Sequence, residues 1–135
     1  MKSRFILMTI LTLGAMLYTN AKAETYYLTS TGAASAQNLS AWNTNPDGSG
    51  IQPSNFTTQG DVFIIPSGIS GNISGSWTIG QGVTLNIQGT LNFIKNSNAV
   101  LTINGTIIFP ENACMSTGGG KNKSTFILSS GAKLK

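Results

Sequence analysis

The chain has 135 residues and a formal net charge of +4 at pH 7, and only 9% of its residues are charged. It contains no histidine, so the usual catalytic base and the commonest metal ligand are missing. Cys114 is the only cysteine, which excludes an intrachain disulfide bond, and we expect this small side chain to be buried.

Residues 1–23 are predicted to be an export signal. Two basic residues precede a mainly apolar run over residues 5–18, and Ala-Lys-Ala at 21–23 is the small-x-small pattern that signal peptidases cleave. The run is too short for a comfortable membrane span. We therefore expect cleavage between Ala23 and Glu24, secretion or display on the outer cell surface, and no membrane association afterwards.

Residues 24–60 are predicted to form an irregular entry or cap segment that begins with a strand at 25–29. Residues 43–48 read NTNPDG and mimic the start of a calcium-binding loop. Such a loop requires a carboxylate at its twelfth position, where this chain has Ser54. Pro, Asp and Gly in succession favour a tight turn, so we expect a turn here and no metal site.

Residues 61–135 are predicted to form the repeats of a β-solenoid. The segments 84–93 (TLNIQGTLNF) and 100–109 (VLTINGTIIF) match at an offset of 16 residues. Apolar residues at every second position indicate strands with one buried face, and a Gly at the same internal place indicates a corner. Stacked coils would place Leu85 on Leu101.

A second match supports the repeat. Trp77 aligns with Phe126 at an offset of 49 residues, close to three units of 16, and this alignment places Trp77 in the core. The six residues between the two best units would also suit a hairpin, so an antiparallel β-sandwich stays the alternative fold. The last unit, residues 126–135, lacks a polar cap. We therefore expect a solenoid that is incomplete at its C-terminal end, continued by a longer protein or covered by a partner.

Four stretches resemble the N-terminal coils of adhesin-type surface proteins that are common in Bacteroidetes: residues 41–63, 60–68 (GDVFIIPSG), 77–93 and 101–109. The resemblance implies a right-handed parallel β-helix followed by downstream domains of the same protein. It also implies an extracellular location and contact with a surface protein or glycan.

The sequence favours a structural or adhesive role without catalysis or a cofactor. The four carboxylates are isolated, and the lysines form no basic stripe for nucleic acid. Two alternatives stay open: a glycan-binding module, and the N-terminal part of a carbohydrate-active β-helix enzyme whose active site lies beyond residue 135. The candidate residues for stacking on sugar rings are Tyr26, Tyr27 and Trp42.

Overall fold

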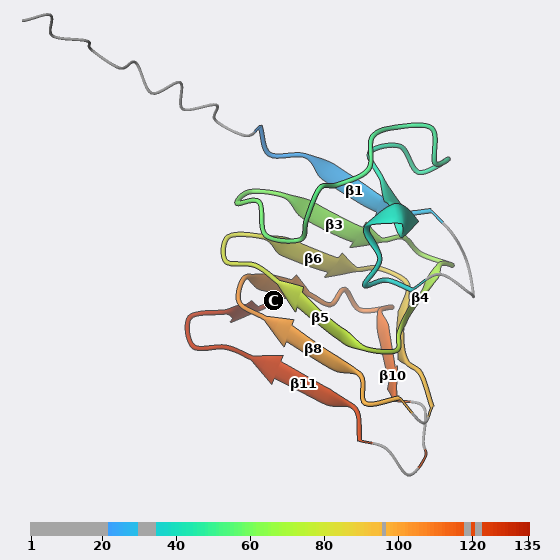
Figure 1. Cartoon of the computed structure of the whole chain (residues 1–135), viewed down its shortest axis with the longest axis vertical. Helices are drawn as coiled ribbons and strands as arrows, with labels where there is room; N and C mark the ends of the chain where they lie inside the picture. Colours follow the sequence, from blue (N-terminus) through green and yellow to red (C-terminus); the bar gives the residue numbers. More distant parts are fainter. Residues whose placement is uncertain (1–21, 30–34, 96, 118–119, 121–122) are drawn as a thin grey trace, which may run out of the picture.

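The computed structural model describes residues 22–29, 35–95, 97–117, 120 and 123–135, so most of the predicted export signal lies outside the described residues. The described chain is an all-β protein of short strands (Figure 1) with one 3-10 helix, η1 (Leu39–Ala41). The strands are β1 (Thr25–Leu28), β2 (Trp42–Asn43), β3 (Val62–Ile65), β4 (Ser70–Ile73), β5 (Ser76–Ile79), β6 (Thr84–Ile87), β7 (Thr90–Phe93), β8 (Val100–Ile103), β9 (Thr106–Ile108), β10 (Cys114–Thr117), β11 (Thr125–Leu128) and β12 (Lys133–Leu134).

The strands form three sheets. Sheet A has the order β12-β9-β6-β3-β1-β2, sheet B the order β10-β7-β4, and sheet C the order β11-β8-β5. From β3 onward each strand pairs in parallel with the strand three places later, so the chain visits sheets A, B and C in turn. We call one such pass a circuit. Among the described strands only β1 and β2 pair antiparallel, which contradicts the sandwich alternative.

The 16-residue repeat does not correspond to one circuit. Strands β6 and β9 lie side by side with Thr84 opposite Thr106, so this circuit advances 22 residues. Leu85 pairs with Ile107, and the predicted stacking of Leu85 on Leu101 is therefore wrong. The two matching segments are β6 with β7 and β8 with β9, each joined by a two-residue corner. The 16-residue repeat therefore reflects two strand pairs with the same two-residue corner, and it does not give the length of a circuit.

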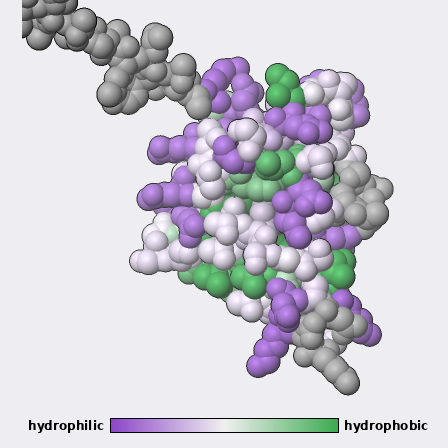
Figure 2. Space-filling model, viewed as in Figure 1, coloured by the Kyte–Doolittle hydropathy of each residue, from purple (hydrophilic) through white to green (hydrophobic). Residues whose placement is uncertain are grey.

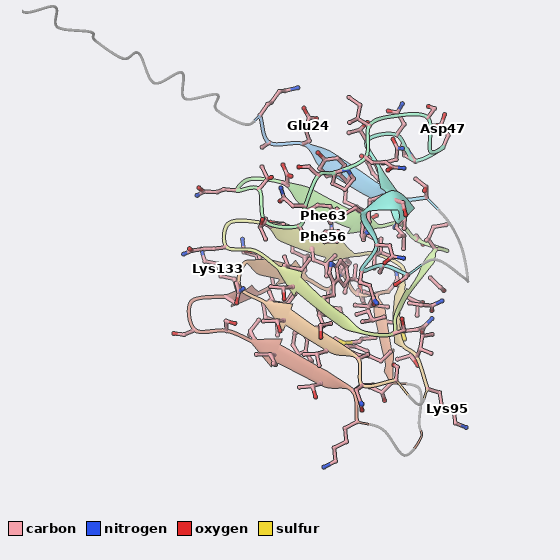
Figure 3. The ribbon with its side chains drawn as sticks, in the orientation of Figure 1. Glu24, Asp47, Phe56, Phe63, Lys95 and Lys133 are labelled. Atoms are coloured by element: carbon pink, nitrogen blue, oxygen red, sulfur yellow. The ribbon has the colours of Figure 1, made fainter. Side chains whose placement is uncertain are left out.

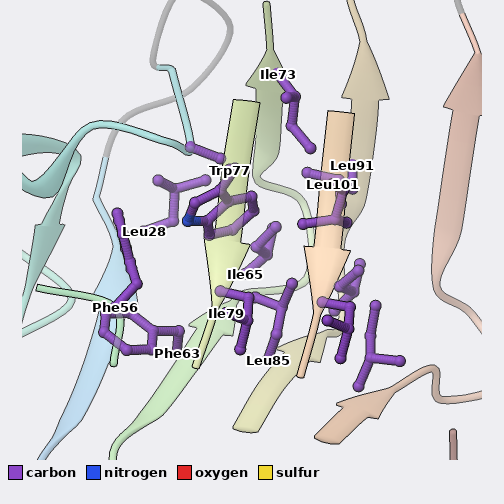
Figure 4. Packing of buried hydrophobic residues seen from close by; sticks show 14 of the residues in the cluster. Leu28, Phe56, Phe63, Ile65, Ile73, Trp77, Ile79, Leu85, Leu91 and Leu101 are labelled. Carbon is purple, nitrogen blue, oxygen red and sulfur yellow. The ribbon is translucent and has the colours of Figure 1, made fainter. Parts of the chain in front are cut away.

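The inward positions of the three sheets build one hydrophobic core. Burial alternates along the strands of the first two circuits, because successive side chains of a strand point to opposite faces. In sheet C the inward residues Trp77, Leu101 and Phe126 are in register on successive strands, and we call such a row an inward column. Trp77 is buried among apolar neighbours (Figure 4), so its predicted place in the core is confirmed.

The entry segment covers the end of the core that adjoins the first circuit. Strand β1 pairs in parallel with β3, and β2 turns back along β1. The ring centroid of Trp42 lies 5.2 Å from that of Phe63 and 6.2 Å from that of Phe56, both in edge-on contacts. Aromatic side chains therefore close this end.

The opposite end of the core is open. Strands β10, β11 and β12 lie at the outer edge of sheets B, C and A there. Phe126, Leu128 and Leu134 continue the inward columns but stay 38%, 42% and 61% exposed. Part of the apolar surface in Figure 2 lies in the lower half of the view, where Figure 1 places β11. Within the described residues, the core therefore ends in an uncovered apolar surface bordered by strand edges.

Cys114 is exposed, so its predicted burial is wrong. It pairs with Thr90, which in turn pairs with Ser70, and these three residues occupy an outward position of sheet B. The alternation of side chains along β10 decides its exposure, because Met115 takes the inward position.

Candidate functional site

Two of the three aromatic residues predicted to stack on sugars are buried. Trp42 has 0% exposure, and its indole Nε1 donates a hydrogen bond to the carbonyl oxygen of Ala36 at 2.8 Å. Tyr26 is 8% exposed and stacks on Phe63 with ring centroids 5.1 Å apart. Burial, and then the nearby Asp61 carboxylate, raise the pKa of the Tyr26 phenol. Neither ring presents a face to a ligand, because the entry segment uses both to close the core.

Tyr27 is half-buried at an outward position of sheet A, where it pairs with Ile64. Along the same row, Ile64 pairs with Asn86 and Asn86 with Ile108. Tyr27 is thus separated from Tyr26 and Trp42, which face inward, and the structure does not gather the three residues into one platform. A role for Tyr27 in ligand binding stays a prediction.

The loop that mimics a calcium site is a hydrogen-bonded turn. The Gly48 amide donates to the Asn45 carbonyl oxygen at 3.0 Å, which closes a turn with Pro46 and Asp47 at its centre. Asp47 Oδ1 accepts from the Ser49 amide at 2.9 Å and from the Ser49 hydroxyl at 2.7 Å. These bonds lower the pKa of Asp47. Within the described ranges, no three His, Cys, Asp or Glu side chains come together as metal ligands.

A polar hollow lies at the corners that lead from sheet C to sheet A. The corner between β8 and β9 has only residues 104–105, whereas residues 80–83 and 129–132 form the corresponding corners of its two neighbours. The Asn104 amide donates to the Ile79 carbonyl oxygen at 2.9 Å, and the Thr106 amide donates to that of Val83 at 2.8 Å. These bonds hold the short corner close to the backbone of the preceding circuit. The longer turns on both sides extend beyond it. We call the resulting hollow the notch.

The floor of the notch requires a glycine. A Cβ atom on Gly105 would overlap the carbonyl oxygens of Val83 and Gly80. On both sides the projecting turns are closed by backbone hydrogen bonds, from Val83 to Gly80 at 3.2 Å and from Ala132 to Ser129 at 3.0 Å. Gly82 and Gly131 take positive φ values of 75° and 86° in these turns. Glycine therefore shapes both the floor and the rims.

The notch is polar and carries one charge. It has a volume of about 420 Å³, and a second hollow of about 320 Å³ adjoins it past Ser129 and Ser130. Figure 3 shows Lys133 at the left of the view, on the side of the molecule where the notch lies. No carboxylate lines either hollow. The side chains that line the main hollow belong to Gln59, Gln81, Asn104, Thr106 and Lys133. Amide, hydroxyl and ammonium groups at one place can bind a small polar ligand by hydrogen bonds.

One hydrogen bond orients the amide at the centre of the notch. The Ser129 hydroxyl donates to Asn104 Oδ1 at 2.6 Å. This bond fixes which end of the Asn104 amide is the acceptor, and its Nδ2 donor has no acceptor among the described residues. Sequence reasoning missed the notch, because the two-residue deficit at residues 104–105 becomes visible only after the strands are paired.

Comparison of the chain with models of protein families, with curated proteins and with solved structures found no match. In the part of the chain that the structure describes, no helix is long and apolar enough to cross a membrane.

Proposed function

We propose that this protein is a secreted, non-catalytic structural or adhesive segment built as a right-handed parallel β-helix. The observation that carries the proposal is the pairing of each strand from β3 onward with the strand three places later. Such pairing stacks one circuit on the next and buries side chains between circuits. The apolar run and Ala-Lys-Ala at residues 5–23 support export.

The open end supports a role as one segment of a larger assembly. Three strand edges and the exposed Phe126, Leu128 and Leu134 lie together there. An uncovered strand edge pairs readily with other strands. In the proposed assembly, further β-strands with apolar residues at every second position continue the three sheets.

Self-association of the protein without residues 1–23 tests this role. We expect it to associate at high concentration, as measured by sedimentation velocity, and replacement of Phe126, Leu128 and Leu134 by Thr to weaken this association. Ile127→Thr is the matched control, because Ile127 is 42% exposed on the same strand but pairs with the outward Thr102. A protein that stays monomeric, or that responds equally to the control, would contradict the assembly role.

Export is tested separately. The full chain should be secreted by a bacterial host, and N-terminal sequencing of the secreted protein should read Glu-Thr-Tyr-Tyr from Glu24. Secretion without cleavage, or retention in the membrane, would contradict the proposed signal.

A second candidate function is binding of an acidic glycan in the notch. The observation that favours it is the convergence of Gln81, Asn104 and Lys133 on a polar hollow that no carboxylate lines. Sugar hydroxyl groups pair with amides, and a uronic acid carboxylate pairs with a lysine ammonium group. The test is a glycan array with the parent protein and with Gln81→Ala and Lys133→Ala. Binding that both variants lose, and that Gln88→Ala at the two-residue corner between β6 and β7 keeps, would support the notch.

A further inference from the structure

Asp61 is a buried carboxylate at a position that later circuits fill with apolar or small residues. It directly precedes β3, as Val83 precedes β6 and Ala132 precedes β12. Its amide closes a turn with the Thr58 carbonyl oxygen at 3.2 Å, as the Val83 amide does with that of Gly80. Asp61 is only 3% exposed. Burial of a carboxylate is costly unless a partner compensates its charge, so this position calls for a partner that the later circuits do not need.

Glu24 lies next to Asp61 in the stack and supplies that partner. The Val62 amide donates to the Glu24 carbonyl oxygen at 2.9 Å, and the Thr84 amide donates to that of Asp61 at 2.9 Å. These equivalent bonds place residue 24 one layer beyond Asp61. The backbone nitrogen of Glu24 donates to Asp61 Oδ1 at 3.0 Å. This is the one hydrogen bond of the Asp61 side chain within the described residues.

We propose that Asp61 is the binding site for a new N-terminus at Glu24, which forms an ion pair with it after proteolytic removal of residues 1–23. The inference rests on the export signal in the proposed function. Hydrolysis of the bond between Ala23 and Glu24 consumes one water: its hydroxyl joins the carbonyl carbon of Ala23 and its remaining proton joins the nitrogen of Glu24. The amine then takes a second proton from solvent and becomes an ammonium group.

The geometry is set before cleavage. The nitrogen that becomes the ammonium group already lies 3.0 Å from Asp61 Oδ1, and the Val62 amide holds residue 24 in register. Cleavage replaces a neutral donor by a charged one, and charge-assisted hydrogen bonds are about twice as strong as neutral ones. It also removes Ala23, whose Cβ lies 2.9 Å from the place that a Cβ on Gly60 would take. The opened corner lets water solvate the other ammonium protons.

Among the described residues, Glu24 and Tyr26 bring further titratable groups to this pair. Glu24 contributes its own carboxylate, which lies 3.3 Å from Lys22 Nζ before cleavage and loses this partner with the signal. Tyr26 on β1 contributes a phenol whose pKa is raised by burial first, and then by the carboxylates of Asp61 and Glu24. The new ammonium group therefore enters a site of negative charge, which favours its protonated form.

The experiment compares four forms of the protein that begins at Glu24, made in vitro by traceless removal of an N-terminal fusion so that no export step is involved. They are the free amine, the Nα-acetylated form, which keeps an N–H donor without the charge, and Asp61→Asn with and without acetylation. We expect the free amine to melt about 4 °C or more above the acetylated form. We expect this difference to vanish in the Asp61→Asn background.

Equal melting temperatures of the free and acetylated forms, or a difference that persists in Asp61→Asn, would overturn the proposal. If Asp61→Asn does not fold, the α-amino pKa of the unsubstituted protein decides, measured by NMR. The ion pair requires a value above the ordinary one of about 8, and an ordinary or lower value overturns the proposal. N-terminal sequencing of the exported protein tests the signal itself, so failure of export and failure of the ion pair are distinguishable.

Discussion

Trp77 and Phe126 occupy the same inward column of sheet C, with Leu101 between them. Trp77 is 2% exposed at the end of the core that the aromatic side chains of the entry segment close, whereas Phe126 is exposed at the open end. Along this column, the side chains are therefore buried at Trp77 and become exposed at Phe126. Their separation of 49 residues spans two circuits, where the repeat predicted three units of 16.

Replacement of Ile103 by Asp should destabilise the protein far more than replacement of Thr102 by Asp. Ile103 is fully buried in the column between Ile79 and Leu128, whereas Thr102 points outward on the same strand. An unpaired buried carboxylate costs several kcal/mol, about the whole stability of a small domain. An outward substitution should stay within about 1 kcal/mol. Urea unfolding checks this, and equal midpoints for the two variants would refute the assigned faces of β8.

The glycines of the corners should differ in their tolerance of alanine. Gly131→Ala meets no atom within 4 Å, so its cost is that of a positive φ, about 1–2 kcal/mol. Gly105→Ala meets backbone oxygens that cannot move without breaking their hydrogen bonds to the Thr106 and Val83 amides, so it should cost more or prevent folding. Thermal unfolding of both variants checks the order. A Gly105→Ala protein as stable as Gly131→Ala would contradict the short corner and with it the shape of the notch.

Trp42→Phe should cost more stability than Trp77→Phe. Both side chains are buried, and both substitutions remove similar volume. Trp42 Nε1 has an acceptor in Ala36, whereas Trp77 Nε1 is buried without a hydrogen-bond partner among the described residues. The lost bond should add about 1–3 kcal/mol to the cost at Trp42. Denaturant titration of the two variants measures the difference, and the reverse order would show that the indole of Trp77 finds a partner in solution.

Asp47 should titrate below its ordinary pKa of 3.8, because the Ser49 hydroxyl and amide donate to its carboxylate. A lowered pKa in the folded state means that the ionised form stabilises the fold. This contribution is present above the ordinary pKa and is lost as the pH falls through the folded value. Ser49→Ala should move the pKa back upward in an NMR titration, whereas the control Ser54→Ala should leave it unchanged. A pKa of Asp47 that does not respond to Ser49→Ala would contradict the turn geometry.

The alternation of apolar and polar residues in the sequence determined the strands and their buried faces. Leu85 and Ile87 are inward as the pattern predicts, because the side chains of a strand alternate by local geometry alone. Gly89 and Gly105 stand at corners as the pattern predicts, but the reason is tertiary, since a Cβ at either would overlap backbone oxygens of the preceding circuit. The core position of Trp77 follows from the same alternation.

Only the tertiary structure decided which strands lie side by side. The corners differ in length, for example residues 104–105 against residues 109–113, so equal spacing in sequence is not equal spacing in the stack. Leu85 therefore meets Ile107 where the repeat suggested Leu101. The burial of Trp42, the notch beside Asn104 and the contact of Asp61 with Glu24 depend on this pairing. Each of these features depends on contacts between residues that are far apart along the chain. No local sequence pattern predicts such contacts.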